Sequence, residues 1–342
     1  MSAALSPLVS VITPVYNGAE HLAACIESVL AQTYVHWDYT IVNNCSADGS
    51  FAIAKKYAAR DSRIRLVNND RYLRIIENHN HAIRQISPDA KYCKFVFADD
   101  WLFPKCLEEM VRVAEAQASV GLVGGFAMDV RSVLWQGPEY PASRVDGREV
   151  CCARLLGGPY LFGTMTSLML RCDLIRKREA FFNEQNLHAD YEACLDVLQE
   201  SDFGFVHQIV AFSRPPDRSS TTTFAKDFHS FLLGEVVIFL KYGPVFLNQE
   251  QFNRRRKSLL GQYYRMLAKN ILCVRSRQFW EYHRNTLAAF GSRIEWGPLT
   301  LSFVKEVVIR LCHPRESLIE IRRWWFGARN LGSGSTGMRH PP

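Results

Sequence analysis

The sequence predicts an α/β protein with a doubly wound, mostly parallel sheet, helices on both faces and an additional helical region at the C-terminus. Short runs rich in β-branched and apolar residues at 8–13, 39–42 and 63–67 are typical of strands. Between these runs, apolar residues recur at helical spacing, and this alternation favours parallel strands connected by helices. From residue 228 onward the pattern is helical only, which indicates a change of architecture.

The other elements of the α/β part follow in chain order. Leu22, Ile26, Val29 and Leu30 recur at helical spacing and predict the first helix. The patterns further along predict helices at 51–59, 78–85, 104–118 and 187–198, and strands at 91–97, 120–126 and 164–171.

The composition is that of an ordinary globular protein. With 342 residues, 48% hydrophobic and 22% charged, the chain is long enough for one or two domains with large cores. We expect no signal peptide, because the N-terminus lacks a basic segment. We expect no membrane-spanning helix, because the apolar stretch 231–247 is interrupted by Glu235 and Lys241. Ten cysteines without a CxxC pair favour reduced thiols in a cytoplasmic protein.

The net charge of +7 is concentrated toward the C-terminus. Residues 251–330 carry 16 Lys or Arg against 5 Asp or Glu, whereas the rest of the chain carries 25 against 29. We therefore expect an α/β domain at 1–224, a basic and aromatic-rich helical region at 225–331 and a disordered tail at 332–342. Anionic surfaces are the natural partners of such a basic segment.

The strand predicted at 91–97 is followed by two adjacent carboxylates, Asp99 and Asp100. In open α/β sheets ligands bind at the carboxyl ends of the strands, and two carboxylates there are able to hold a divalent cation that binds a phosphate. The alternative is that both acids only cap a helix beginning near Pro104, since Pro is common at the first helical position. This segment alone leaves both interpretations open.

Several motifs in a fixed order give the chain a resemblance to a known family. TPVYNG at 13–18, NNCSADGS at 43–50, the helix around Asn80 and FADDW at 97–101 resemble the nucleotide-sugar-binding half of a family-2 glycosyltransferase with the GT-A fold. The resemblance covers about residues 8–220. It implies a donor-binding half at about 8–130 and an acceptor half at about 131–224.

The resemblance implies roles for individual residues of the donor half. Pro14 and Tyr16 would pack on uracil or another base, and Asn80 would belong to the donor site. In the acidic motif, Asp99 would lie near the ribose and Asp100 would bind Mg²⁺ or Mn²⁺.

Two motifs depart from the family's pattern. The family commonly has Asp-Asp where this chain has Asn43 and Asn44, and a further Asp where Phe97 stands. An Asn side-chain oxygen still accepts a hydrogen bond from a base N–H, although the bond is no longer charge-assisted. The alternative is that Asn43 and Asn44 only build a turn. A nucleotide contact is the interpretation favoured here, because ligands bind at this edge of the sheet.

The resemblance also implies a general base. Family-2 enzymes carry an acidic pair, usually Glu-Asp, where this chain has Ala189 and Asp190, so only Asp190 carries over as the base. One carboxylate that takes the proton from the acceptor hydroxyl is what an inverting transfer requires. The helical spacing of Leu187, Tyr191 and Leu195 places Asp190 in a first helical turn. There, the alternative role is simply to stabilise the helix N-terminus.

The segment SRPPDRSSTTT at 213–223 resembles the loop that closes over the donor in this family, with Pro in place of the usual His. Arg214 and Arg218 are expected to pair with diphosphate oxygens. Further on, basic amphipathic helices and the aromatic cluster Trp324 to Phe326 are compatible either with an interfacial helix on an anionic membrane or with a helical lid.

The predicted function is a metal-dependent, inverting transfer of a sugar from a nucleotide-sugar, most simply a UDP-sugar, to a hydroxyl of a cell-surface glycan precursor, free or lipid-linked. The enzyme is expected in the cytoplasm, where it would also be peripheral at the inner membrane face. The alternative is a non-catalytic nucleotide-sugar or glycan-binding protein that kept the fold. No nucleic-acid partner is expected, because the basic region has no helix-turn-helix or zinc pattern. A dinucleotide dehydrogenase is disfavoured, because the first strand leads into TPVYNG and not into GxGxxG.

Overall fold

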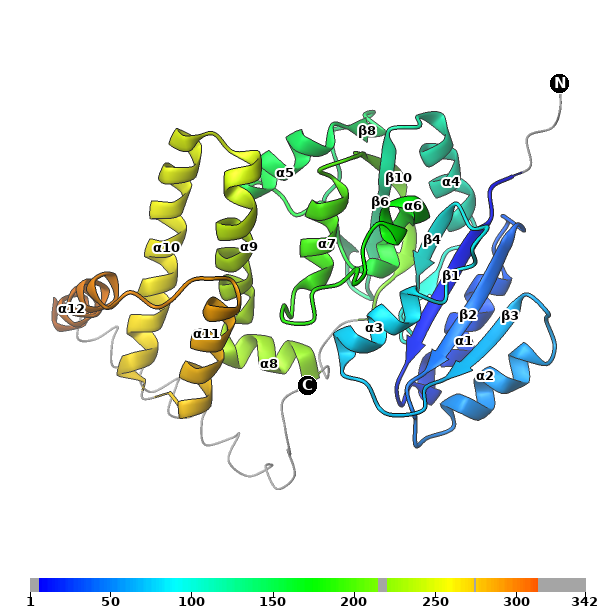
Figure 1. Ribbon diagram of the computed structural model, residues 1–342, viewed down its shortest axis with the longest axis horizontal. Coiled ribbons are helices and arrows are strands. Elements are labelled where there is room, and N and C mark those ends of the chain that lie inside the picture. Colours follow the sequence, from blue (N-terminus) through cyan, green and yellow to red (C-terminus); the bar gives the residue numbers. More distant parts are fainter. Residues whose placement is uncertain (1–5, 215–219, 274, 313–342) are drawn as a thin grey trace. The chain divides into compact units, whose positions relative to one another are not determined.

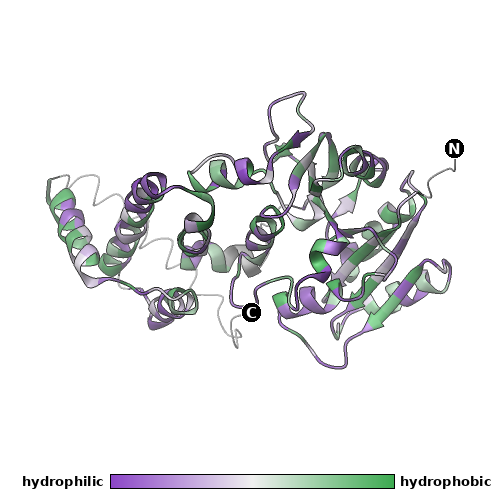
Figure 2. Ribbon diagram, turned by 45° about the horizontal axis from the view of Figure 1, so that its top comes forward, coloured by the Kyte–Doolittle hydropathy of each residue, from purple (hydrophilic) through white to green (hydrophobic). Residues whose placement is uncertain are grey.

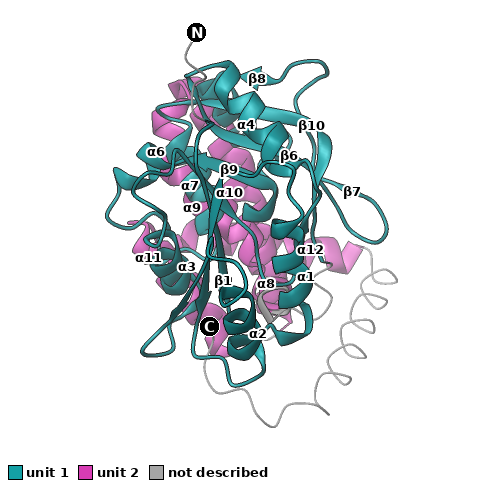
Figure 3. Ribbon diagram, turned by 90° about the vertical axis from the view of Figure 1, so that its right-hand side faces the viewer, with its two compact units in different colours: residues 1–218 teal, residues 219–342 magenta. Residues whose placement is uncertain are grey.

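The computed structural model describes residues 6–214, 220–273 and 275–312, drawn as a ribbon in Figure 1. The chain forms two compact units, Met1–Arg218 and Ser219–Pro342, coloured teal and magenta in Figure 3. The sequence placed this boundary after residue 224, but α8 (Ser220–Phe228), the first helix of unit 2, already begins at Ser220. The helical region therefore begins a few residues before the position that the amino-acid composition indicated.

Unit 1 is built on one sheet with the strand order β3-β2-β1-β4-β9-β6-β10-β5. Its first four strands in that order are all parallel, and helices connect them as the sequence predicts (Figure 1). These strands are β1 (Val9–Val15), β2 (Trp37–Asn43), β3 (Ile64–Asn68) and β4 (Tyr92–Phe95). The connecting helices are α1 (Ala19–Leu30), α2 (Ser50–Ala58) and α3 (Ile75–Ile83).

The second half of the sheet contains the antiparallel exceptions. β9 (Leu168–Arg171) runs antiparallel to both of its neighbours, β4 and β6 (Val120–Met128), whereas β10 (Asp202–Phe212) is parallel to β6. Three short strands pair antiparallel at the margins: β5 (Trp101–Leu102), β7 (Val133–Leu134) and β8 (Arg144–Val145). The predicted α/β class with a mostly parallel sheet is confirmed.

The remaining elements of unit 1 cover this sheet or connect its strands. They are α4 (Cys106–Ala116), α5 (Gly147–Leu155), α6 (Cys172–Arg176), α7 (Ala189–Val197) and a single 3₁₀ turn, η1 (Met165–Ser167).

The centre of the unit 1 core is β1, whose seven residues are all buried. A strand covered on both faces needs a continuous run of this kind, and α1 adds Leu22, Ile26 and Val29 to the same core. Pro14 is tolerated in β1 because pairing with β4 ends at Ile12 and Phe95, so its missing N–H interrupts no ladder with β4. The chain can thus bend into the loop that follows β1.

Several predicted elements have different limits in the structure. β4 ends at Phe95 and not at 97, and α4 begins at Cys106, so Pro104 is not its first residue. In the segment 164–171, only β9 is a strand. Its first part forms η1 because the ammonium of Lys94 binds the carbonyl oxygens of Thr166 and Leu168 and draws the backbone toward β4.

The described residues of unit 2 form helices, which confirms the helical C-terminal region expected from the sequence. After α8 come α9 (Ser230–Phe246), α10 (Gln249–Leu272), α11 (Arg277–Ala289) and α12 (Trp296–Cys312). Figure 2 shows hydrophobic and hydrophilic residues interspersed along these helices. In the part of the chain that the structure describes, no helix combines the length and hydrophobicity needed to cross a bilayer. The aromatic cluster at 324–326 and the tail 332–342 lie outside the described residues.

Candidate functional site

The loops that follow β1 and β2 bind each other at the carboxyl edge of the sheet. The backbone N–H of Asn17 donates to Ser46 Oγ at 3.0 Å, and the N–H of Ala47 donates to Asn17 Oδ1 at 2.9 Å. Ser50 Oγ accepts from the N–H of Gly18 at 2.9 Å. Asn17 has a φ of +50°, a conformation that Asn adopts more readily than most residues. TPVYNG and NNCSADGS therefore form one continuous edge.

An exposed aromatic pair lies at this edge. Pro14 is buried inside β1, but Tyr16 is 52% exposed. The ring of Tyr16 meets the edge of the Tyr72 ring, with the centroids 4.9 Å apart, and Tyr72 is 47% exposed. Such a pair offers ring faces on which a nucleotide base could stack. The sequence predicted Tyr16 but missed Tyr72, which comes from the loop after β3.

Asn43 and Asn44 end β2 in different environments, although both are buried. Asn44 Oδ1 accepts from the N–H of Leu73 and from Asn69 Nδ2, both at 2.9 Å, and Asn44 Nδ2 donates to the Leu73 carbonyl at 2.8 Å. Asn43 Nδ2 donates to Asn68 Oδ1 at 2.6 Å. Asn43 Oδ1 has no hydrogen-bond partner among the residues that the structure describes.

The two asparagines therefore have different capacities. The side chain of Asn44 holds the loop after β3, and this loop carries Tyr72. The contacts of Asn44 therefore agree with the alternative in which this residue only builds a loop. Asn43 is the member of the pair with an acceptor to spare, and a buried acceptor without a donor is destabilising. A donor from a ligand or water would relieve that deficit.

Asp100 is the buried member of the acidic pair, with 4% of its surface exposed, whereas Asp99 is exposed. Asp100 Oδ2 accepts from the Thr166 hydroxyl at 2.6 Å, and Asp100 Oδ1 accepts from the backbone N–H of Arg214 at 2.9 Å. Arg214 Nε also donates to the Asp99 carbonyl at 3.3 Å. The structure thus brings Asp99, Asp100 and Arg214 together, as expected, while Arg218 lies outside the described residues.

Neither acid caps a helix. β5 separates the pair from α4, and Lys105 occupies the N-cap position of that helix. The capping alternative is therefore wrong, because β5 carries the chain away from the acids to pair with β10 before α4 begins.

Burial raises the pKa of Asp100 to about 6. The hydrogen bond from Thr166 acts in the opposite direction, while the charge of Asp99 raises the pKa of Asp100 further. A cation beside Asp100 would favour its charged form. The described residues contain no group of three or more His, Cys, Asp or Glu able to enclose a metal. Mg²⁺ commonly takes one or two carboxylates from the protein and its other ligands from water and phosphate, so Asp100 beside Asp99 fits such an ion.

Asn80 positions a loop of the acceptor half. Its Nδ2 donates to the Phe182 carbonyl at 2.8 Å and to Glu184 Oε1 at 3.1 Å, and its Oδ1 accepts from the Phe182 N–H at 2.8 Å. Further along this loop, Asn186 Nδ2 donates to the buried carboxylate of Glu192 at 2.7 Å. These contacts fix the segment that leads into α7 and give the Asn80 side chain a different task from the donor contact predicted.

Asp190 lies in the first turn of α7, as its helical spacing predicts. It is half-buried, and its Oδ1 accepts from the backbone N–H of Tyr191 at 2.8 Å. Burial raises the pKa of Asp190, while the nearby His188 lowers it. A partly exposed carboxylate with a raised pKa is the kind of group that accepts a proton from a hydroxyl near neutral pH.

Comparison with known proteins identifies the family. The model of glycosyl transferase family 2 matches residues 10–177, which include all the motifs from TPVYNG to FADDW. Residues 10–177 belong to glycosyltransferase family 2. EpsE of Bacillus subtilis, named as a glycosyltransferase, is 38% identical over 119 residues, which are 34% of this chain and 42% of EpsE. The chain thus spans less than half the length of this curated relative.

Two solved structures show the same fold as this chain. S. aureus TarS in complex with UDP-GlcNAc has a TM-score of 0.60 at 13% identity, with 83% of this chain and 80% of that chain covered. The mannosyltransferase PcManGT from Pyrobaculum calidifontis, in complex with GDP-Man and Mn²⁺, has a TM-score of 0.53 at 16% identity, with 97% and 89% covered. At these identities the likeness concerns the fold alone, which is of the GT-A type expected.

In this family-2 domain an aromatic contact occupies the position of the missing acid. Phe97 stacks on His79, with ring centroids 5.3 Å apart and the ring planes 28° from parallel. The acidic motif therefore has two carboxylates, and Phe97, at the position of the expected further Asp, contacts His79 of α3.

Besides Tyr72, sequence reasoning missed Thr166, which binds Asp100, and Lys94, which binds the Thr166 carbonyl. Thr166 is 66 positions from Asp100, and nothing in its own neighbourhood marks it. Lys94 did carry a signal. It interrupts the apolar run of a strand that was expected to be buried on both faces, and a lysine in such a strand must find oxygen partners.

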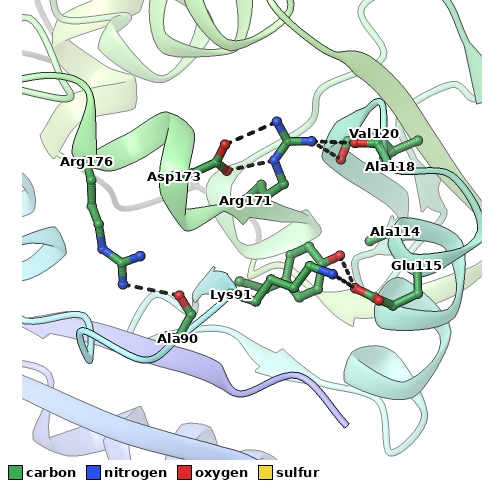
Figure 4. A pocket seen from close by; sticks show the side chains of 10 residues that line it. Ala90, Lys91, Ala114, Glu115, Ala118, Val120, Arg171, Asp173 and Arg176 are labelled. Atoms are coloured by element: carbon green, nitrogen blue, oxygen red, sulfur yellow. Dashed lines mark hydrogen bonds and ion pairs between the residues drawn. The ribbon is translucent and has the colours of Figure 1, made fainter. Parts of the chain in front are cut away.

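A cavity of unit 1 in the described residues is separate from this site. It has a volume of about 490 Å³ and lies at the other end of β4, beside Lys91 and Tyr92 (Figure 4). Four of the charged groups that line it form two ion pairs: Arg171 Nε lies 2.7 Å from an oxygen of Asp173, and Lys91 Nζ lies 2.6 Å from an oxygen of Glu115. Arg176 donates to the carbonyl oxygens of Ser87 and Ala90. None of the predicted site residues lines it.

Proposed function

We propose that this chain is a metal-dependent, inverting glycosyltransferase that moves a sugar from a nucleotide-sugar, most simply a UDP-sugar, to a hydroxyl of a cell-surface glycan precursor. The observation that carries the proposal is the buried carboxylate of Asp100 beside Asp99, on the same sheet edge as the exposed pair Tyr16 and Tyr72. Support for the donor class comes from family membership and from structural neighbours whose complexes contain UDP-GlcNAc or GDP-Man.

The donor would lie along the carboxyl edge of the sheet. Tyr16 and Tyr72 would stack on the base, and Asn43 Oδ1 would accept from a base N–H. The exposed carboxylate of Asp99 would accept from a ribose hydroxyl. Arg214 would direct its remaining guanidinium N–H groups at the diphosphate, because only its Nε binds the Asp99 carbonyl.

Asp100 would hold Mg²⁺ or Mn²⁺ at the diphosphate. When bound, the ion neutralises the charge that develops on the departing nucleoside diphosphate. Arg214 would add N–H donors to the same oxygens, and Arg218 is proposed to do so as well. Support for the ion comes from the raised pKa of Asp100 and from the Mn²⁺ in the complex of PcManGT.

Asp190 would act as the general base. It would take the proton from the attacking acceptor hydroxyl while that oxygen forms the new bond to the sugar and the bond to the diphosphate breaks. A single displacement of this kind inverts the configuration at the anomeric carbon. Asn80 would contribute by holding the loop that precedes α7 in place.

A thermal-shift panel tests the donor assignment. UDP-, GDP-, CDP- and dTDP-sugars are compared with and without Mn²⁺, and we expect a Mn²⁺-dependent rise in melting temperature for one base. Slow hydrolysis of that donor to free sugar then separates an enzyme from a non-catalytic binding protein. Binding without hydrolysis, and without transfer to any extracted glycan acceptor, would support the non-catalytic alternative.

We also propose that the protein works in the cytoplasm at the surface of an anionic membrane. The outward side of α12 carries Leu301, Val304, Val308 and Leu311, which recur at helical spacing and are 57%, 51%, 51% and 74% exposed. Residues 220–312 carry 14 Lys or Arg against 6 Asp or Glu. An apolar helix face in a basic unit suits a bilayer with anionic lipids, where a lipid-linked acceptor would be found.

A further inference from the structure

Lys94 is a charged residue in the middle of the core. It lies in β4 with 0% of its surface exposed. Its Nζ donates to the carbonyl oxygens of Thr166 and Leu168, the second at 3.0 Å, and lies 3.6 Å from Met110 Sδ. No carboxylate forms an ion pair with Lys94 within the described part of the chain. Burying an ammonium group without a paired carboxylate is strongly unfavourable, and burial lowers the pKa of Lys94, although its interactions with Cys106 and Asp100 act in the opposite direction.

Packing alone does not account for a lysine at this position. The neighbouring β4 residues Tyr92, Cys93 and Phe95 are buried, and an apolar side chain at 94 would avoid the desolvation of an ammonium group. What the ammonium provides is two directed bonds to the backbone of η1 and the start of β9. These bonds fix the orientation of that turn relative to β4.

The turn that Lys94 holds carries the hydroxyl that binds Asp100. Thr166 Oγ1 donates to Asp100 Oδ2 at 2.6 Å and accepts from the backbone N–H of Phe97 at 3.1 Å. The carbonyl of the same residue accepts from Lys94. Thr166 is therefore bound on its backbone side by the ammonium and on its side-chain side by the carboxylate. Its own side chain is buried, so it has little freedom to re-orient.

We propose that Lys94 is a positioning residue for the metal and diphosphate site, acting through Thr166 to hold the carboxylate of Asp100 in one orientation. The inference rests on the proposed function, because that function makes Asp100 a metal ligand. Hydrogen bonds that orient a ligating carboxylate typically alter metal affinity by about 10- to 100-fold when they are removed. Lys94 itself touches neither metal nor substrate.

The first test compares two lysines three positions apart. Lys94→Met keeps the length of the side chain and removes the ammonium, and Lys91→Met makes the same change at a half-exposed ion pair with Glu115. Calorimetry measures the dissociation constants of UDP with Mn²⁺ for each protein. We expect binding to weaken about 10- to 100-fold in the Lys94 variant and to stay within about twofold in the Lys91 variant. Equal affinity in both variants overturns the proposal.

A double-mutant cycle separates positioning from a general loss of stability. Thr166→Val removes the hydroxyl and Thr166→Ser retains it, so the first should weaken binding like the Lys94 variant and the second should bind like the original protein. Because Lys94 acts through Thr166, the variant with Lys94→Met and Thr166→Val should bind no more weakly than the weaker single variant. Losses that multiply overturn the proposal, since they indicate two independent effects.

Two further readouts keep the outcome decisive. If Lys94→Met fails to fold, as judged by circular dichroism and melting temperature, Thr166→Val provides the test of loss and Lys94→Arg the test of retention, because a second cation should keep Mn²⁺-dependent binding. Weak binding in a folded Lys94→Arg variant contradicts the proposal. If the original protein binds no nucleotide with Mn²⁺, the proposed function itself fails. If it binds and Lys94→Met binds equally well, only the role of Lys94 fails.

Discussion

At the scale of a single residue, burial and metal binding have opposite effects on the protonation of Asp100. Burial favours its neutral form, whereas a divalent cation binds its charged form. Its pKa is raised from 3.8 to about 6, so it adds stability at low pH that is lost as the pH rises through about 6. In the metal-free protein this loss is about 3 kcal/mol.

We therefore expect the effect of Mn²⁺ with UDP on the melting temperature to grow between about pH 5 and about pH 7, since proton and metal compete for Asp100. Asp100→Asn should remove this growth, flatten the fall in metal-free stability over the same range and abolish Mn²⁺-dependent donor binding. Scanning calorimetry of both proteins across this range measures all three effects. If Mn²⁺ with UDP changes the melting temperature of the original protein equally at every pH, Asp100 is not a metal ligand.

Asp190→Asn tests the general base. The change removes a proton acceptor but keeps the volume of the side chain, so donor binding should persist while transfer to the acceptor falls by about two to four orders of magnitude. Binding calorimetry and a transfer assay are run on the same preparation. Near-normal turnover would leave Asp190 with only an electrostatic effect on the N-terminus of α7.

Residues marked by local pattern were found from the sequence, and residues defined by distant contacts were not. Asp100 follows an apolar strand and Asp190 falls in a first helical turn, so short stretches of sequence place both, while their proposed roles come from the family resemblance. The group that donates to Asp100 Oδ1 is 114 positions away, at Arg214, and was anticipated only through the family resemblance. At Asn80 the motif suggested a ligand contact, which stays a prediction, and the hydrogen bonds of its amide to the Phe182 backbone were not foreseen.

At the scale of elements, the sheet was predicted but its antiparallel members were not. Leu168, Met169 and Leu170 of β9 are all buried, as they would be in a parallel strand covered on both faces. The burial of these side chains therefore does not reveal the direction of the strand. β5 has two residues and no periodicity at all. Its direction follows from pairing with β10, more than a hundred positions later.

The loop before α7 provides a prediction at this scale. Asn80→Ala removes three hydrogen bonds to the loop and leaves the Phe182 backbone groups without partners, which destabilises the loop by about 1–3 kcal/mol. Because the loop leads to Asp190, we expect kcat to fall while donor affinity changes by no more than about twofold. Asn253→Ala, on the exposed side of α10, is the matched control. A loss of donor affinity with unchanged kcat would instead place Asn80 at the donor.

At the scale of the whole molecule, the charge and the exposed side of α12 predict membrane binding. In a flotation assay the protein should rise with anionic liposomes at low salt, and high salt should release part of it. Salt screens the attraction between basic side chains and anionic lipids but does not weaken the apolar contact. Val304→Gln with Val308→Gln should reduce the salt-resistant part.

The control for this experiment is Val133→Gln, a change of the same kind at a 53% exposed valine of unit 1, which should float like the original protein. Protein that stays unbound at every salt concentration would show that the membrane proposal is wrong. Binding that survives in the α12 variant would assign the apolar contribution to another part of the chain.

The two hydrogen bonds to Asp100 have a consequence for the order in which ligands arrive. A carboxylate has about four lone-pair sites, and Thr166 and Arg214 already use two of them. An ion at Asp100 must then complete its shell mainly with oxygens that the protein does not supply, so free ion should bind weakly on its own. We expect the chelate of nucleotide and ion to be the species captured from solution. The cellular supply of that chelate, more than the concentration of free ion, would then set how much of the protein is loaded.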